Sequence, residues 1–260
     1  MKRQFLALLA ALAMLPGCGI LSGKLDGSSL AGAAGTAMTA LTISDEQIAQ
    51  LSAQTVAYMD STNTVDSGSY DARLRRLLAK VKSIDGIPVN FKVYRTAEVN
   101  AFACGDGSIR VYSGLMDLMD DAELMAVIGH EIGHVRNKDT KTAMKKTYMT
   151  YAARMAIASA GGLLGNLSSS VLGDIAQSYL SAQYSQKQEF AADENGFLFA
   201  IEQGYGPYSM YNSLVKLMKL SETSSGGGTV TSGISQAFSS HPDTEERAAR
   251  MKAAAEAYGK

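Results

Sequence analysis

The sequence predicts a mostly helical α+β domain that contains a small antiparallel β-sheet. Apolar residues between Ile48 and Tyr58 recur every three or four positions, as on one face of a helix. Residues 88–94 instead alternate between apolar and polar side chains, which is typical of a half-buried strand. Helical periodicity returns after Asp120 and continues through most of the remaining chain. A few strands beside a larger number of helices define the α+β class.

The folded part is expected to begin with a helix that starts at Ser44. Gln47 lies three residues after Ser44, so each side chain can accept a hydrogen bond from the other residue's backbone N–H in a capping box. Ile43 precedes this cap and can pack on Ile48, in the arrangement called a hydrophobic staple. These two local signals predict where the domain starts.

A second helix and the small sheet are expected next. Leucine and valine residues between positions 74 and 81 have helical spacing, and this helix is expected to stop near Gly86. The strand at 88–94 follows. Residues 100–112 then predict a β-hairpin whose turn lies at residues 105–107, Gly-Asp-Gly.

The rest of the chain is expected to be helical. One helix starts near Asp120, whose side chain can cap it with Glu123 as the capping-box partner. Four further helical segments are predicted at roughly 141–161, 168–203, 206–221 and 242–257. Residues 148–165 are apolar enough to suggest a membrane span, but Arg154 and a pair of glycines interrupt the run. We interpret this segment as a core helix or a helix that covers the functional site.

The N-terminus has the features of a bacterial lipoprotein signal. Two basic residues precede an apolar run from Phe5 to Leu15, which is too short to be a good membrane span. The run ends in "LPGC", which resembles a lipobox, and a lipobox cysteine, here Cys18, is lipidated and becomes the mature N-terminus. A plain signal peptide with an incidental cysteine is the alternative. Gly19, rather than aspartate, follows the cysteine, so the resemblance implies the periplasmic face of the outer membrane.

These features divide the chain into three parts. Residues 1–17 are predicted to form the signal peptide, 18–42 a flexible lipid-anchored tether rich in Gly, Ala and Ser, and 43–260 the folded domain. Lipidation of Cys18 would leave Cys104 without a disulfide partner in the chain, so Cys104 is expected to be a small buried hydrophobe. The formal net charge of −1 argues against a nucleic-acid-binding protein, which would need a basic surface.

The motif "HEIGH" at residues 130–134 indicates metal chemistry. Residues four apart lie on one face of a helix, so His130 and His134 can present two imidazole nitrogens to one ion. Glu131 is rotated by about 100° from His130 around the helix and can lean over the metal without binding it. Two histidine ligands and a carboxylate base are what a zinc hydrolase needs. The alternative is an ordinary buried helix with two hydrogen-bonded histidines.

A catalytic zinc site also needs a third protein ligand and one open position. Asn137 and Thr140 stand where the metzincin pattern has a glycine and a third histidine, which excludes that class. The segment "QEFAADE" offers Glu189 as the third ligand, and Asp193 one turn later can accept a hydrogen bond from the outer nitrogen of a ligand histidine. An ordinary solvated acidic face is the alternative for this pair.

Together these motifs resemble the HtpX- and CAAX-prenyl-protease-like zinc peptidases. The pairing of H-E-x-x-H with E-x-x-A-D carries the likeness, and "VNAFACGDGSIRVYSGLMDLM" and "SHPDTEERAARM" extend it from about residue 40 to the end of the chain. It implies a gluzincin-type metallopeptidase domain in which the small sheet lies beside the zinc-binding helix. Gln186 departs from the pattern, since most of the family has arginine three residues before the glutamate ligand.

The expected function is that of a zinc-dependent endopeptidase with one Zn²⁺ per chain and Glu131 as general base. Substrate would add as an extended strand along a sheet edge, formed either by Asn100, Ala101, Phe102 and Ala103 or by residues 109–112. Such recognition suits unfolded or misassembled envelope proteins, and the resemblance implies a quality-control role. The rival classes are a zinc-stabilised chaperone or assembly adaptor for outer-membrane proteins, and a membrane-embedded CAAX-type protease.

His241 is the remaining histidine of the three in the chain. It follows a segment rich in Gly and Ser and precedes Pro242, which suits the first position of the last helix. The loop could carry His241 to the metal, where it would fill the open position and inhibit the enzyme. His241 could instead donate a hydrogen bond to the oxyanion during catalysis. A surface histidine is the third possibility, and the resemblance favours the inhibitory role.

Overall fold

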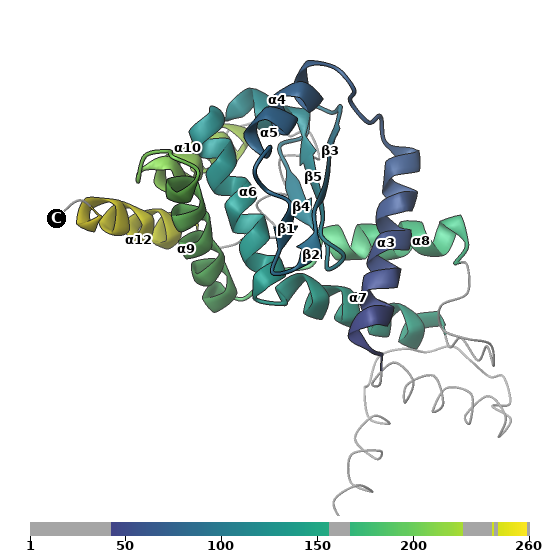
Figure 1. The fold of residues 1–260 in the computed structure, drawn as a ribbon. Coiled ribbons are helices and arrows are strands. Elements are labelled where there is room, and N and C mark those ends of the chain that lie inside the picture. The colour runs from purple at the N-terminus through teal and green to yellow at the C-terminus, as the bar shows by residue number, and fades with distance from the viewer. Residues whose placement is uncertain (1–42, 156–166, 226–240, 242–243, 259–260) are drawn as a thin grey trace, which may run out of the picture.

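The computed structural model describes residues 43–155, 167–225, 241 and 244–258 (Figure 1). Within these residues a small sheet is flanked by helices that make up most of the structure, which confirms the predicted α+β class. The predicted signal peptide and tether lie outside the described residues, as do the end of the helix predicted at 141–161 and most of the loop before His241.

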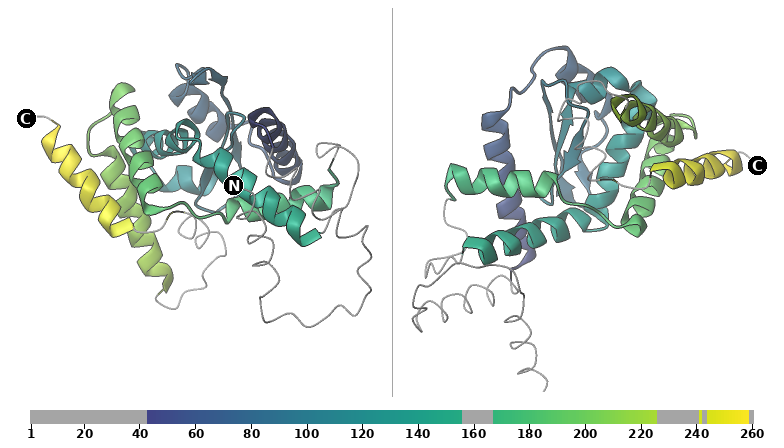
Figure 2. Two further views of the ribbon diagram at one scale, coloured as in Figure 1. Left: turned by 90° about the horizontal axis from the view of Figure 1, so that it is seen from below. Right: turned by 180° about the vertical axis from the view of Figure 1, so that it is seen from behind.

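The helices form two groups on opposite sides of the sheet (Figure 2). The group at the N-terminal side contains α3 (Asp45–Thr62), α7 (Asp139–Met155) and α8 (Ser169–Leu180). The other group contains α9 (Gln186–Glu202), α10 (Ser209–Ser225) and α12 (Thr244–Ala257), with α6 (Asp121–Arg136) between this group and the sheet. Two short helices, α4 (Ser69–Leu77) and α5 (Ser113–Leu118), lie near the top of the sheet in Figure 1.

Both predicted capping boxes are present. Ser44 Oγ accepts from the N–H of Gln47 at 3.2 Å, and Gln47 Oε1 accepts from the N–H of Ser44 at 2.8 Å. Asp120 and Glu123 make the same reciprocal pair at the start of α6, both at 2.9 Å. These caps satisfy backbone donors that a helix leaves free at its N-terminus, so they fix where α3 and α6 begin.

The main sheet is mixed rather than wholly antiparallel. Strands β3 (Asn90–Tyr94), β5 (Ser108–Tyr112) and β4 (Ala101–Ala103) pair in that order. The predicted hairpin is present, since β4 is antiparallel to β5, but β3 is parallel to β5 with Tyr94 opposite Tyr112. The chain reverses once after β3 and again after β4, which returns β5 to the direction of β3.

Two predicted helices have different ends in the structure. The helix predicted at 168–203 is two helices, because α8 ends at Leu180 and Ser185 begins α9 with a capping box to Gln188. The helix that was expected to stop near Gly86 ends at Leu77. Strands β1 (Ser83–Ile84) and β2 (Ile87–Pro88) follow it as a hairpin, whose two turn residues have φ of 48° and 86°. Positive φ at both positions is typical of a type I′ turn.

The sheet buries both of its faces. One face packs against α4 and α6, and its buried side chains include Val93, Ile109 and Val111. The other face presents three aromatic residues, Tyr94, Phe102 and Tyr112, to α3 and α8. Cys104 is fully buried in this second core, as predicted, and burial raises the pKa of its thiol. Within the residues described, no helix combines the length and apolar character needed to cross a lipid bilayer.

Candidate active site

Two helices approach each other closely because small residues line their contact. A Cβ atom added to Gly129 of α6 would lie 2.7 Å from the Cβ of Phe199 on α9. One added to Gly133 would lie 2.9 Å from the Cβ of Asn195. Both distances are shorter than packed carbon atoms allow, so glycine at these positions is what brings α6 against α9.

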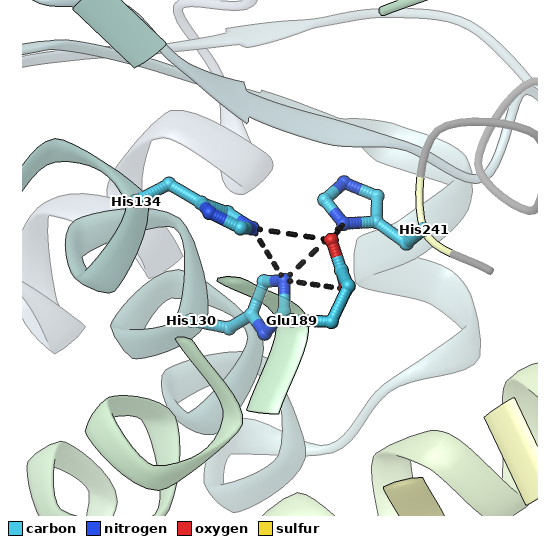
Figure 3. Close-up of side chains that lie close together, drawn as sticks. All are labelled: His130, His134, Glu189 and His241. Atoms are coloured by element: carbon cyan, nitrogen blue, oxygen red, sulfur yellow. Dashed lines mark hydrogen bonds and ion pairs between the residues drawn. The ribbon is translucent and has the colours of Figure 1, made fainter. Parts of the chain in front are cut away.

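Four side chains of metal-ligating types, which together could hold a metal ion, converge where these helices meet (Figure 3). His130 Nε2 lies 3.1 Å from His134 Nε2, and these atoms lie 3.6 and 3.5 Å from the carboxylate oxygens of Glu189. His241 Nδ1 lies 2.8 Å from Glu189 Oε1 and 3.3 Å from His130 Nε2. One donor atom from each of the four residues falls within 4.8 Å of the others.

The outer ring nitrogens of two histidines are held by aspartates. His130 Nδ1 lies 2.9 Å from Asp193 Oδ1, and His134 Nδ1 lies 3.0 Å from Asp139 Oδ2. Gln188 in turn donates to the other oxygen of Asp139 at 2.6 Å. Donation of the Nδ1 proton to a carboxylate leaves each Nε2 lone pair directed at the centre of the cluster. The sequence did not indicate Asp139, whose distance from His134 along the chain matches no simple helical spacing.

Arg247 on α12 neutralises the two buried acidic residues of α9, Glu189 and Asp193. Its Nη1 lies 2.7 Å from Glu189 Oε2, and its Nε and Nη2 donate to the two oxygens of Asp193 at 2.8 and 2.7 Å. The side chain is buried with 3% exposed. Arg247 is absent from the residues predicted for the site. Its position one turn before the buried Met251, on the apolar side of a helix, was an available signal.

The electrostatics of the cluster favour a cation. Burial lowers the pKa of His130. Burial also opposes protonation of His134, but hydrogen bonds to Asp139 and Glu189 outweigh it and raise its pKa to about 9. The pKa of Glu189 is well below its ordinary value, because the imidazoles of His241 and His134 outweigh the effect of burial.

The donor set fits a metal ion. The two Nε2 atoms that face each other would repel as lone pairs without a cation or a proton between them. Glu189 Oε2 is buried without a hydrogen bond from any described residue, although Arg247 lies within ion-pair distance. Imidazole and carboxylate donors at such mutual distances are the ligands of protein-bound divalent transition metals.

Two further side chains border the cluster without belonging to it. Glu131 is 5% exposed, and its Oε1 lies 3.8 Å from His241 Nε2. Tyr184, in the loop between α8 and α9, stacks on His134 with ring centroids 4.0 Å apart and an interplanar angle of 16°. The sequence pattern predicts a continuous helix at Tyr184 and therefore does not indicate this contact.

The structure distinguishes between the two predicted sheet edges. Strand β5 pairs on both sides, so the prediction that residues 109–112 form a docking edge is wrong. Among the described residues, strand β4 pairs only with β5, and it borders a cleft with about 540 Å³ of open space. The residues that line this cleft include Asn100, Ala101, Val127, His130, Glu131 and Met210.

The outer edge of β4 offers few free backbone groups. Tyr112 N donates to Asn100 O and Cys104 N donates to Ser108 O, so even-numbered residues of the strand face β5. Ala101 and Ala103 therefore direct their N–H and C=O groups outward. The hydroxyl of Tyr179 already donates to Ala103 O at 2.5 Å. Of these two residues, only Ala101 has neither its N–H nor its C=O bonded to another part of the described chain.

A histidine pair one helical turn apart, an adjacent carboxylate and an open strand edge define a class of protein, the metal-dependent peptidases. Comparison with known families is consistent with that class. Residues 68–255 match the profile described as "Peptidase family M48", and the chain belongs to this family.

Two relatives from Escherichia coli (strain K12) match almost the whole chain. The metalloprotease LoiP is 38% identical over 253 residues, which cover 96% of this chain and 95% of the relative. The metalloprotease YcaL is also 38% identical over 253 residues, with 96% of each chain covered. A protease HtpX homolog from Salinibacter ruber is 32% identical over 177 residues, or 59% of this chain and 63% of the relative. The full-length matches are thus to proteins that carry the name metalloprotease.

Proposed function

We propose that this metallopeptidase is a zinc-dependent endopeptidase that cuts unfolded or misassembled proteins of the cell envelope. The convergence of His130, His134 and Glu189 carries the proposal of zinc, because two imidazoles and one carboxylate are a ligand set that catalytic zinc sites use. Each ligand histidine also has an aspartate on its outer nitrogen, which is the support that zinc sites commonly have.

The roles of the surrounding residues follow from their positions. Bound at these three residues, zinc supplies a Lewis acid that polarises the scissile carbonyl and makes water more acidic. Glu131 takes the proton from the attacking water and passes it to the leaving amine. Arg247 holds Glu189 and Asp193 in place and offsets their charge.

The substrate pairs as an extended strand with β4. Ala101 supplies the free N–H and C=O groups for this pairing, and the cleft beside it borders both His130 and Glu131. Backbone pairing depends little on side-chain identity but requires an extended chain, so unfolded segments qualify and folded ones do not. The lipobox-like segment ending at Cys18 supports a location at the periplasmic face of the outer membrane. There, unfolded envelope proteins are the available substrates.

The location can be tested independently of the activity. Cys18→Ser is expected to abolish incorporation of labelled palmitate, because the lipid is attached through this sulfur. Incorporation that survives the substitution would contradict the lipid anchor. Cys104→Ser serves as the control, since that thiol is buried in the core.

His241 acts as an inhibitory fourth ligand in this proposal. Its Nδ1 belongs to the same group of donors as the three ligand atoms, which would leave no open position on the ion. Movement of His241 away would open that position. His241→Ala is then expected to raise kcat/KM, whereas an oxyanion-donor role predicts a loss of about a hundredfold. The ratio of kcat/KM for the His241→Ala protein to that of the wild type, at equal zinc content, decides between these roles.

A pair of substitutions tests the enzyme itself. Glu131→Gln should retain one zinc per chain and lose about a thousandfold in kcat/KM on an unfolded protein such as casein, as expected for a missing general base. Glu189→Ala should instead lose zinc. Glu194→Gln, an exposed change on the same helix as Glu189, is the control for both.

The same experiment addresses the rival function. A zinc-stabilised chaperone or assembly adaptor would bind zinc through these ligands but would not depend on Glu131. Wild-type cleavage by Glu131→Gln protein would therefore exclude the mechanism. If the wild-type protein cleaves no substrate, and the wild-type and Glu131→Gln proteins suppress aggregation equally, the adaptor function would be favoured.

A further inference from the structure

A second cavity lies at the corner between α6 and α7, with about 500 Å³ of open space. None of the four metal-ligating residues lines it. In Figure 1 the β1–β2 turn, the end of α6 and the start of α7 meet at this corner. The apolar part of its wall consists of Ile84 and Ile87 from the hairpin and Val135 from α6.

The rim of this cavity is basic. Arg136, Lys138 and Lys141 line it, and Asp85 is the one acidic residue among its lining residues. Arg136 lies 3.5 Å from Asp85, and Lys141 pairs with Asp45 at 2.6 Å. Lys138 forms no ion pair with any residue that the structure describes. The cavity therefore has an excess of positive charge that its own residues do not neutralise.

Backbone and hydroxyl donors add to this charge. Residue Lys138 has a φ of 61° and immediately precedes α7, whose first N–H groups have no partner within the helix. Thr140, in that first turn, lines the cavity and is 1% exposed, and its Oγ1 has no hydrogen-bond partner among the described residues. The N-terminus of a helix also carries a partial positive charge that favours anions.

We propose that this cavity binds a phosphate group that is attached to a hydrocarbon chain, as in an anionic lipid. A phosphate has several oxygens and can accept from Lys138, Arg136 and the first turn of α7 together. The apolar wall at Ile84, Ile87 and Val135 suits an attached chain. The cavity also lies next to the start of the described domain, since Lys141 pairs with Asp45 in the first turn of α3. Any anchor on the preceding residues would therefore attach on this side of the domain.

The test uses the full-length, metal-loaded protein in a nonionic detergent. Isothermal titration with inorganic phosphate and with dihexanoyl phosphatidic acid compares a free phosphate with a lipid phosphate. Lys138→Gln removes one cation from the rim. Lys146→Gln removes the same charge from an exposed position of α7 that does not line the cavity, and it is the matched control.

Both ligands should bind saturably, with the lipid at least tenfold tighter than inorganic phosphate. Lys138→Gln should weaken binding by about tenfold, the size of one charge-assisted hydrogen bond, and Lys146→Gln by less than twofold. Equal affinity for both ligands would overturn the assignment to a lipid. Absence of saturable binding, or equal weakening by the two substitutions, would overturn the site itself.

Discussion

Within the described residues, two clusters of charged side chains, one part-buried and one buried, differ in whether their hydrogen-bonding groups are satisfied. At the interface of α3 with the sheet, Asp60 accepts from Arg110 Nε and Nη2 at 2.8 and 2.9 Å. It also accepts from Lys92 Nζ at 2.7 Å and Tyr94 Oη at 2.8 Å. Each carboxylate oxygen of Asp60 thus has two donors, and this cluster is complete without any other component.

The metal-ligating cluster is incomplete by the same measure. Its two Nε2 atoms face each other at 3.1 Å with no donor between them, and the ion pair with Arg247 is the one close contact of Glu189 Oε2 outside the cluster among the described residues. Both clusters contain an arginine that pairs with an aspartate, Arg110 with Asp60 and Arg247 with Asp193. The difference shows that buried charge at the α3 interface supports the fold, whereas at the α6–α9 interface it prepares a place for an ion.

The largest effect should come from removing the metal. A ligand that binds only the folded protein adds about 4 kcal/mol to its unfolding free energy at a thousand times its dissociation constant. Chelation should therefore lower Tm by several degrees, and added zinc should restore it. Chelation should lower the Tm of the Arg110→Met protein by the same amount, as measured by calorimetry, because this substitution lies in the cluster that holds no ion. An unchanged Tm after verified metal loss would remove the distinction between the clusters.

Damage to the complete cluster should affect stability and leave catalysis alone. Arg110→Met leaves the part-buried Asp60 with fewer partners. Breaking a fully buried pair costs about 3–5 kcal/mol, so the expected loss is at the lower end of this range or below it. The midpoint of urea unfolding measures the loss. Arg75→Met is the matched control, because Arg75 pairs with Asp71 at the surface and such pairs contribute under about 1 kcal/mol. If Arg110→Met changes kcat/KM more than twofold at a temperature where the protein is folded, this cluster is not separate from catalysis.

A methyl group between α6 and α9 should lower catalysis as well as stability. Gly133→Ala places a Cβ 2.9 Å from the Cβ of Asn195, and overpacking of this kind costs about 1–3 kcal/mol. It also shifts His134, on the same turn, so kcat/KM should fall by about a hundredfold. Gly105→Ala is the control, since its nearest neighbour would lie 3.8 Å away. Full activity of the Gly133→Ala protein would show that the site tolerates a wider helix separation.

The two clusters should respond to opposite ends of the pH scale, with a slope of at most about 1.4 kcal/mol per pH unit for each proton. In metal-free protein the pKa of His134 is raised from 6.5 to about 9. Its stabilising contribution is therefore present below pH 6.5 and lost as the pH rises towards 9. Burial opposes ionisation of Asp60, but its hydrogen bonds from Arg110 and Lys92 keep its pKa below 3.8, so its contribution is lost only in acid below that value. The urea midpoints of metal-free wild-type and metal-free Asp60→Asn proteins should therefore fall in parallel from pH 6 to 9, because only the His134 contribution changes in this range.

The sequence predicted those parts of the site that depend on local spacing. Two histidines four residues apart on a helix must share a face. The capping residues Ser44 and Asp120 specify helix starts through contacts with residues only three positions further along the chain. Ser185 and Gln188 carry the same capping signal, but they lie within a long helical pattern that hides it. Local sequence spacing therefore predicted the starts of α3 and α6 and the shared helix face of Glu189 and Asp193 on α9.

The remaining features depend on contacts between distant segments. Arg247 reaches Asp193 from 54 positions further along the chain, and no periodicity links the two. The parallel pairing of β3 with β5 likewise depends on how the intervening strand turns back, which is a property of the whole sheet. Such contacts become evident only when the helices and strands have been placed in three dimensions.

The capped edge of β4 has a further consequence for how the molecules behave towards each other. An exposed strand edge is a template for another copy of the same protein, and long flat edges lead to aggregation. Here the strand spans Ala101–Ala103, and the hydroxyl of Tyr179 occupies the outward carbonyl of Ala103. An edge this short offers too few backbone groups for stable edge-to-edge pairing with the sheet of a second copy. The molecules are therefore expected to resist polymerisation through this edge.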